Sequence, residues 1–244
     1  MYGLIGKKIG HSFSAEFFNK KFKREGVNNT YNLFPLESID EFPKLLKEKP
    51  EIQGLNVTIP YKIEIIPFLD YLSPDAKEIG AVNVIKIERS DEGTWLGGYN
   101  SDYIGFLESL KPYLNDKIKN ALVLGTGGAS KAVAYALKKL NIKPTFVSRN
   151  PDKEELSYSQ LDEGILSENF LIVNTTPLGM FPDVSTYPSI PYHLLTPQHV
   201  CYDLVYNPLK TEFLRRCEEQ GTTVVNGIEM LELQALAAWD IWNK

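Results

Sequence analysis

The chain has 244 residues, 43% of them hydrophobic and 23% charged, which is enough to bury a core without disulfides or metal ions. That length suits one large domain or two small ones. The formal net charge is -5, so the chain lacks the basic surplus typical of DNA- or RNA-binding proteins, although a few local basic residues can still bind a small anion.

Neither the cysteines nor the start of the chain points to an exported or membrane protein. Cys201 and Cys217 belong to no Cys-x-x-Cys pair, so we expect buried thiols in a reducing compartment. The first residues lack the basic and apolar segments of a signal peptide. No apolar run reaches the ~18 residues that cross a bilayer. We therefore expect a cytoplasmic protein with no membrane partner, no nucleic-acid partner and no bound metal.

The first half of the chain alternates strand-like and helix-like segments. Short apolar runs predict strands over 2–5, 30–34, 54–59, 83–87 and 94–98. Apolar residues at helical spacing predict helices over 15–25 and 39–48. Pro60 suits the first turn of a further helix, and the polar turn 90–93 joins the last two strands as a pair. The run Gly97-Gly98-Tyr99-Asn100 breaks this pattern, and we expect a domain boundary there.

The second half restarts the alternation. Apolar runs predict strands over 121–124, 144–148, 170–174 and 200–204. Helices are predicted over 130–140 and, at the end of the chain, over 229–243. Strands separated by helices imply an α/β fold whose parallel sheet has helices on both faces.

A glycine-rich turn connects the first strand and helix of this second half. It reads Gly125-Thr126-Gly127-Gly128-Ala129-Ser130. The first glycine permits a tight turn, and the next lets the backbone approach a pyrophosphate at the helix N-terminus. This is the context of a dinucleotide-binding turn. The competing interpretation is a plain strand-to-helix turn.

The end of the next strand indicates which dinucleotide would bind. A binder of NAD usually places an acidic residue there, but this strand ends in Ser148 and Arg149. Arg149 can pair with a 2′-phosphate, and Lys153 can add a second charge. Asp152 is a counter-signal that lies beyond the strand tip, and a solvated arginine is the alternative. The sequence favours NADP.

Two candidate catalytic residues lie at predicted helix starts. Lys62 would lie in the first turn after Pro60, where the helix dipole opposes its charge and lowers the pKa of its ammonium group. An ordinary exposed lysine is an equally good interpretation. Asp102 precedes another helix, and taken alone it is better read as an N-cap. The spacing does not show that these two side chains meet.

Two serines close the first predicted strand-to-helix connection. Ser12 and Ser14 bring two hydroxyl groups near a helix N-terminus, where they can bind a carboxylate. Helix capping is the competing account. We interpret the neighbouring His11 as a structural histidine.

Taken together, these motifs resemble the shikimate dehydrogenase family over nearly the whole chain. Eight motifs occur in the order of that family, and Gln234 lies in the closing helix as it does there. In chain order the eight motifs are Ile9–Ser14, Asn56–Lys62, Gly80–Asn83, Asn100–Asp102, the glycine turn, Asn174–Met180, Asp203–Pro208 and Asn226–Leu231.

The resemblance implies a fold and an activity. A substrate domain, residues 1–101 and 228–244, would be completed by the C-terminal helix, and an NADP-binding Rossmann domain would cover 102–227. The implied reaction is the reversible NADPH-dependent reduction of 3-dehydroshikimate to shikimate in aromatic amino acid biosynthesis. The implied assembly is a monomer or a homodimer.

The resemblance also implies site residues. Lys62 and Asp102 would form the catalytic pair. The substrate would be bound by Ser12 and Ser14 at its carboxylate and, elsewhere, by Thr58, Asn83, Tyr206 and Gln234. The cofactor would be bound by Gly125, Gly127, Gly128, Ala129, Ser148, Arg149, Lys153, Thr175, Met180 and Gly227.

The chain departs from the family pattern in three ways. Ser148-Arg149-Asn150 replaces the more usual Asn-Arg-Thr, Thr126 stands where alanine is common, and the chain is somewhat shorter than most members.

Three other functions are weighed against this one. A quinate/shikimate dehydrogenase that also uses NAD would be favoured by an acidic residue at the strand tip. A methylenetetrahydrofolate dehydrogenase is not expected to carry the Gly-His-Ser-x-Ser pattern. A non-catalytic ligand sensor is expected to have lost Lys62 or Asp102.

Overall fold

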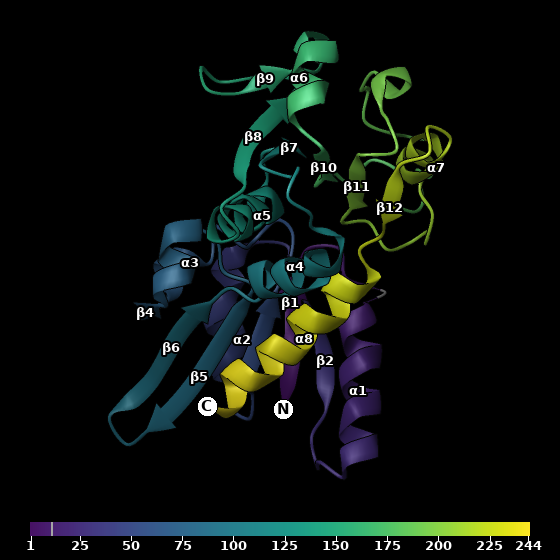
Figure 1. Cartoon of the computed structure of the whole chain (residues 1–244). Helices are drawn as coiled ribbons and strands as arrows, with labels where there is room; N and C mark the ends of the chain where they lie inside the picture. Colours follow the sequence, from purple (N-terminus) through teal and green to yellow (C-terminus); the bar gives the residue numbers. More distant parts are fainter. Residues whose placement is uncertain (11) are drawn as a thin grey trace. The chain divides into compact units, whose positions relative to one another are not determined.

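The computed structural model describes residues 1–10 and 12–244, so the expectation for His11 lies outside the described residues. The chain divides into two compact units (Figure 1). The first unit comprises Met1–Ser101 and Gln234–Lys244, and the second comprises Asp102–Leu233. The second division falls inside the last helix, six residues beyond residue 228. Each unit is described by itself below.

The first unit is built on a six-stranded mixed sheet with the order β2-β1-β3-β5-β6-β4. The strands β2, β1 and β3 are parallel, whereas β5 is antiparallel to both β3 and β6. The predicted strand pair is therefore confirmed as the β5–β6 hairpin. In chain order the strands are β1 (Tyr2–Gly6), β2 (Tyr31–Pro35), β3 (Gly54–Val57), β4 (Tyr71–Leu72), β5 (Val84–Ser90) and β6 (Gly93–Tyr99).

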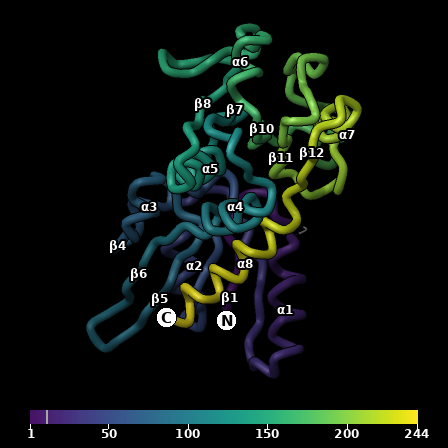
Figure 2. Tube along the Cα trace, in the orientation of Figure 1, coloured from purple at the N-terminus to yellow at the C-terminus, as the bar shows by residue number. Residues whose placement is uncertain are grey.

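Helices cover both faces of this sheet. One face packs on α1 and on the C-terminal part of α8, through an aromatic cluster in which Tyr2 stacks on Trp242 at 4.7 Å between ring centroids. The tube in Figure 2 shows α1 running alongside β2. The other face packs on α2, whose Phe42 is fully buried. The helices are α1 (Phe13–Glu25), α2 (Phe42–Glu48), α3 (Pro74–Ile79) and α8 (Ile228–Asn243), with 3-10 turns η1 (Ile39–Glu41) and η2 (Ile66–Phe68).

The prediction of a helix that begins at Pro60 is wrong. The segment that carries Lys62 is a series of turns that ends in η2. The backbone carbonyl of Lys62 accepts a hydrogen bond from the Val82 amide at 2.7 Å, so it does not serve a helical ladder. Bonds from Phe68 to Ile65 and from Leu69 to Ile66 are of the tighter 3-10 type. The argument from a helix dipole at Lys62 therefore fails, because this segment does not form a helix.

The second unit contains a six-stranded sheet with the order β12-β11-β10-β7-β8-β9, in which every pair is parallel. This is the doubly wound Rossmann order, and its direction reverses between β7 and β10. Ligands of such sheets bind beyond the carboxyl ends of the strands at that point. The strands are β7 (Asn120–Leu124), β8 (Lys143–Ser148), β9 (Leu156–Ser157), β10 (Leu171–Asn174), β11 (Val200–Asp203) and β12 (Thr223–Val225).

Two hydrophobic cores lie on opposite faces of this second sheet. Successive residues of β7 alternate between them, because Val123 packs in the core with α4 and α5, and Leu124 packs in the core with α6 and α7. The α/β fold class is confirmed. The remaining elements are α4 (Asp102–Leu110), η3 (Lys111–Tyr113), α5 (Gly128–Lys139), η4 (Tyr158–Gln160), α6 (Glu163–Glu168), η5 (Tyr192–Leu194) and α7 (Glu212–Glu218). Among the described residues, none of these helices is long and apolar enough to cross a membrane.

Candidate active site

Three polar side chains at the end of the first sheet form one buried cluster. Asn83, which directly precedes β5, donates from Nδ2 to the Ser101 hydroxyl at 3.0 Å and accepts from the Ser101 amide at 2.6 Å. The Ser101 hydroxyl lies 3.4 Å from Oε1 of Gln234, on α8, and donates to it. Two predicted substrate residues from distant parts of the chain are thereby brought together. Ser101 itself was not predicted to take part.

The two serines of the first connection lie at the start of α1. Ser12 is the N-cap residue, with extended backbone, but within the described residues its side chain makes no capping hydrogen bond. Ser14 follows in the first turn of the same helix. Capping therefore does not account for the hydroxyl of Ser12, which leaves it available to a ligand.

Thr58 directly follows β3 and is held against the first strand. Its amide donates to the carbonyl of Ile5 at 2.9 Å. A Cβ on Gly6 would lie only 2.5 Å from the Thr58 methyl group, so the close approach requires glycine at position 6. Lys62 follows in the same unit, within the turns described above.

Asp102 and Tyr206 belong to the second unit. Asp102 is the first residue of α4 and is buried. Tyr206 follows β11, and partial burial raises the pKa of its phenol above the ordinary value. The second unit therefore holds one member of the predicted catalytic pair and one predicted substrate residue, whereas Lys62 belongs to the first unit.

The glycine turn has the geometry that a phosphate-binding turn requires. Gly125 has a φ of +103°, and a Cβ there would lie 3.0 Å from both Thr175 and Thr176. Gly127 is the N-cap of α5, and an added Cβ would meet no heavy atom within 4 Å. Gly128 and Ala129 form the first turn of that helix. Open space therefore lies before a helix N-terminus that can attract a phosphate.

The tip of β8 carries the predicted selector of NADP over NAD. Ser148 ends the strand, and its hydroxyl accepts from the Asn150 amide at 3.2 Å. Arg149 and Lys153 are both exposed. Burial raises the pKa of the Tyr158 phenol, and the charge of Arg149 opposes that shift.

The other predicted cofactor residues follow β10 and β12. Thr175 donates from its hydroxyl to the carbonyl of Leu124 at 2.7 Å, which ties the β10 loop to the start of the glycine turn. Met180 is exposed. A Cβ on Gly227 would collide with the Leu204 carbonyl oxygen, so only glycine fits at this close backbone approach.

A buried carboxylate joins the loops that follow β10 and β11. No sequence pattern indicated its role beyond its place in a family motif. Asp203 accepts from Asn174 at 2.9 Å, from the Val205 amide at 3.0 Å and from the Thr211 hydroxyl at 2.5 Å. Burial raises the pKa of Asp203 to about 6, although these three hydrogen bonds oppose the shift. Asp203 thus holds in place the segments that carry Thr175 and Tyr206.

The residues of the glycine turn and of the β8 tip fit a bound NADP. The open space at Gly127 suits a pyrophosphate, the N-terminus of α5 supplies amide donors, and exposed Arg149 suits a 2′-phosphate.

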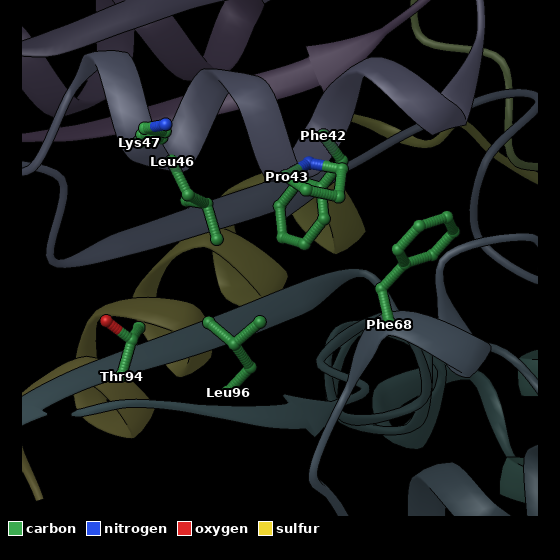
Figure 3. A pocket seen from close by; sticks show the side chains of 7 residues that line it. All are labelled: Phe42, Pro43, Leu46, Lys47, Phe68, Thr94 and Leu96. Carbon is green, nitrogen blue, oxygen red and sulfur yellow. The ribbon is translucent and has the colours of Figure 1, made fainter. Parts of the chain in front are cut away.

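A separate hollow of about 440 Å³ lies on the α2 face of the first sheet (Figure 3). Its lining is mostly apolar and contains none of the predicted site residues, so it is not part of the candidate site. The lining residues are Phe42, Pro43, Leu46, Lys47, Phe68, Thr94 and Leu96.

Comparison with known proteins gives the same family that the motifs indicated. The model of the shikimate dehydrogenase substrate binding domain matches residues 4–85. A Clostridium botulinum relative named shikimate dehydrogenase (NADP(+)) is 39% identical over 252 residues, which cover 98% of this chain and 95% of the relative.

Solved structures of other proteins match this chain over both of its units. The crystal structure of shikimate dehydrogenase from Aquifex aeolicus has a TM-score of 0.87 and 37% identity, covering 99% of this chain and 91% of its own. A Thermus thermophilus shikimate 5-dehydrogenase in complex with NADP(H) and shikimate has a TM-score of 0.85 and 32% identity, covering 99% and 92%. The chain therefore belongs to the shikimate dehydrogenase family.

Proposed function

We propose that this chain is an NADP-dependent shikimate dehydrogenase, which reversibly reduces 3-dehydroshikimate to shikimate in aromatic amino acid biosynthesis. The observation that carries the proposal is the 39% identity, over 98% of the chain, to a relative named shikimate dehydrogenase (NADP(+)). The glycine turn and the exposed Arg149 support NADP as the cofactor, because they offer groups suited to its pyrophosphate and its 2′-phosphate.

The substrate is proposed to bind chiefly to the first unit. Ser12 and Ser14 hold its carboxylate at the start of α1, and Thr58, Asn83 and Gln234 bind its ring hydroxyl groups. Tyr206, from the second unit, adds a phenol. The buried position of Asn83 and its two bonds to Ser101 support this role, because a rigid amide gives a fixed donor and acceptor.

The cofactor is proposed to bind to the second unit. Backbone amides at the N-terminus of α5 hold the pyrophosphate, and Arg149 pairs with the 2′-phosphate. The proposed contacts are the residues of the glycine turn and strand tip and those of the later loops: Gly125, Gly127, Gly128, Ala129, Ser148, Arg149, Lys153, Thr175, Met180 and Gly227.

Proton transfer is assigned to the side chains of this chain. When bound, NADPH supplies the hydride that reduces the ketone carbon of 3-dehydroshikimate. The ketone oxygen gains negative charge as it is reduced, and the Lys62 ammonium group stabilises that charge and donates the proton. Asp102, the second member of the proposed pair, orients the lysine and shares the hydrogen bonds to the substrate hydroxyl groups.

One assay tests the proposed function. The purified chain is incubated with shikimate and NADP, and the appearance of NADPH is followed by its absorbance. Parallel reactions contain quinate in place of shikimate and NAD in place of NADP. We expect turnover with shikimate and NADP to be much the fastest. Equal turnover with quinate and NAD would replace the proposal with a broader quinate/shikimate dehydrogenase, and no turnover in any reaction would favour a ligand sensor.

The proposal extends to location and assembly. We propose a cytoplasmic enzyme that works as a monomer or a homodimer, with shikimate and 3-dehydroshikimate as its small-molecule partners. Light scattering during size-exclusion chromatography distinguishes a 27.6 kDa monomer from a dimer of twice that mass.

A further inference from the structure

The phenol of Tyr31 is fixed inside the aromatic core of the first unit. Tyr31 lies on β2 and is 2% exposed. Its ring stacks on Phe18 with 4.8 Å between the centroids and 10° between the planes, and Trp242 lies 6.4 Å away. Because the neighbouring rings pack against the face of the Tyr31 ring, the side chain cannot change its rotamer freely. The core therefore fixes the position of its hydroxyl oxygen.

That hydroxyl reaches across the central strand to Asn56. β1 lies between β2 and β3, and Tyr31 and Asn56 pair with Tyr2 and Leu4, which both point into the same core. The Tyr31 hydroxyl donates to Oδ1 of Asn56 at 2.7 Å. Nδ2 of Asn56 in turn donates to the backbone carbonyl of Asn83 at 3.1 Å. The phenol is therefore two hydrogen bonds away from the residue proposed to bind the substrate ring.

The backbone of Tyr31 is tied to α1, because the Asn19 side chain donates to its carbonyl and accepts from its amide, both at 2.9 Å. The helix whose first turn carries Ser14 is thus fixed relative to the backbone of Tyr31.

We propose that Tyr31 is a positioning residue for substrate binding, whose hydroxyl group holds Asn56 and, through it, the backbone of Asn83 at the ring-binding end. This inference rests on the proposed function, because it takes over the role assigned there to Asn83. Tyr31 itself does not touch the substrate and acts only through these neighbours.

The phenol has one proton, and it donates that proton to Oδ1 of Asn56. This bond fixes which end of the Asn56 amide accepts, so that Nδ2 is left to donate to the Asn83 carbonyl. Without the phenol oxygen, Asn56 would lose the donor that fixes its side-chain rotamer, and rotamer freedom would have to be given up on binding.

The experiment compares Tyr31→Phe, Ser14→Ala and the double variant by calorimetric shikimate binding and by steady-state kinetics. Tyr31→Phe keeps the ring and removes one oxygen. We expect the Kd and KM for shikimate to rise about tenfold, the scale of one lost hydrogen bond, with the KM for NADP unchanged. Because Tyr31 acts through Asn56 and not through Ser14, the losses of the two single variants should add in the double variant.

Tyr202→Phe is the matched control, since it removes a 2.7 Å hydrogen bond between another buried tyrosine and Ser109 in the second unit. Both phenylalanine variants should lower Tm, but only Tyr31→Phe should weaken shikimate binding. If Ser14→Ala weakens binding while Tyr31→Phe leaves the Kd within about twofold, the Tyr31 inference is overturned and the proposed function stands. If the unsubstituted chain neither binds nor turns over shikimate, both are overturned.

Discussion

Asn83 and Ser101 exchange a pair of hydrogen bonds, one from the Ser101 amide at 2.6 Å and one to the Ser101 hydroxyl at 3.0 Å. Both residues are almost fully buried. The pair fixes which end of the Asn83 amide accepts and which donates, so the side chain presents one defined orientation to a ligand. Ser101 is also the last residue of the first unit before α4 begins.

Ser101→Ala tests this pair. The substitution removes the hydroxyl that accepts from Asn83 and donates to Gln234, and we expect the KM for shikimate to rise by up to about tenfold. The KM for NADP should not change. Ser109→Ala, which removes an equally buried serine hydroxyl from the second unit, is the control. A parallel rise in both KM values would show a loss of folding rather than of substrate orientation.

Lys62→Ala tests the proposed proton donor. General acid catalysis typically supplies ~10²–10⁴-fold, so kcat for shikimate oxidation should fall by about that factor. The free energy of unfolding should change little. Lys62→Arg, which keeps the charge but is a far weaker acid, should remain slow. A near-normal kcat for Lys62→Ala would remove Lys62 from the mechanism.

Arg149→Ala tests the selection of NADP. A charge-assisted hydrogen bond contributes about 1.5–3 kcal/mol, so the KM for NADP should rise by about 10- to 150-fold. The KM for NAD should stay nearly constant, because NAD has no 2′-phosphate. The KM of Arg149→Lys for NADP should lie between that of the unsubstituted chain and that of Arg149→Ala, since lysine keeps the charge but loses bidentate pairing. Equal effects on both cofactors would contradict the assignment.

The local parts of the fold could be predicted from the sequence, and the parts that depend on distant contacts could not. The turn from β7 to α5 was found because an apolar run, three glycines and a helical pattern follow one another directly. The helix expected at Pro60 failed because the Lys62 carbonyl bonds to Val82, a partner outside the segment. The two-residue strand β4 was missed for a similar reason, since it exists only through pairing with Gly97 and Gly98.

The prediction of the candidate site was limited in the same way, because contacts between distant parts of the chain could not be predicted. Asn83 and Gln234 were predicted as substrate residues, whereas Ser101 was quoted only as part of the Asn100–Asp102 motif. Its role could not be predicted because it depends on a contact with Gln234, 133 positions away along the chain. Tyr31 belongs to no quoted motif, and its role depends on the strand order of the first sheet. Asp203 was quoted only as part of a motif.

Asp203→Asn tests the buried carboxylate. Its pKa is raised from 3.8 to about 6 in the folded chain. The folded state therefore binds a proton more readily than the unfolded state between these values. Hence this group's contribution to the free energy of unfolding is largest below about pH 4, falls as pH rises to about 6 and is constant above. Over this pH range the contribution of Asp203 to the free energy of unfolding changes by about 3 kcal/mol.

The asparagine variant should lack this dependence, since its amide can still pair with Asn174 and Thr211 but does not titrate. The difference in Tm between variant and unsubstituted chain should therefore move by several degrees in favour of the variant between about pH 4 and pH 7. Asp183→Asn, an exposed carboxylate in the same unit, is the control. A Tm difference that stays constant with pH would show that Asp203 titrates normally.

Gly54→Ala tests how the last helix packs on the first sheet. A Cβ on Gly54 would lie 2.5 Å from the indole of Trp242, whose Nε1 donates to the Ile85 carbonyl at 3.0 Å. Because the indole is held by that bond and by the aromatic core, it cannot move aside freely. We expect Gly54→Ala to lower the free energy of unfolding by about 1–3 kcal/mol, measured by urea denaturation.

Trp242→Ala should lower the free energy of unfolding by about 3–5 kcal/mol. In the double variant the new methyl group meets no indole, so its cost should fall below the sum of the two single costs. Strict additivity would mean that the glycine is required for some reason other than the contact with Trp242.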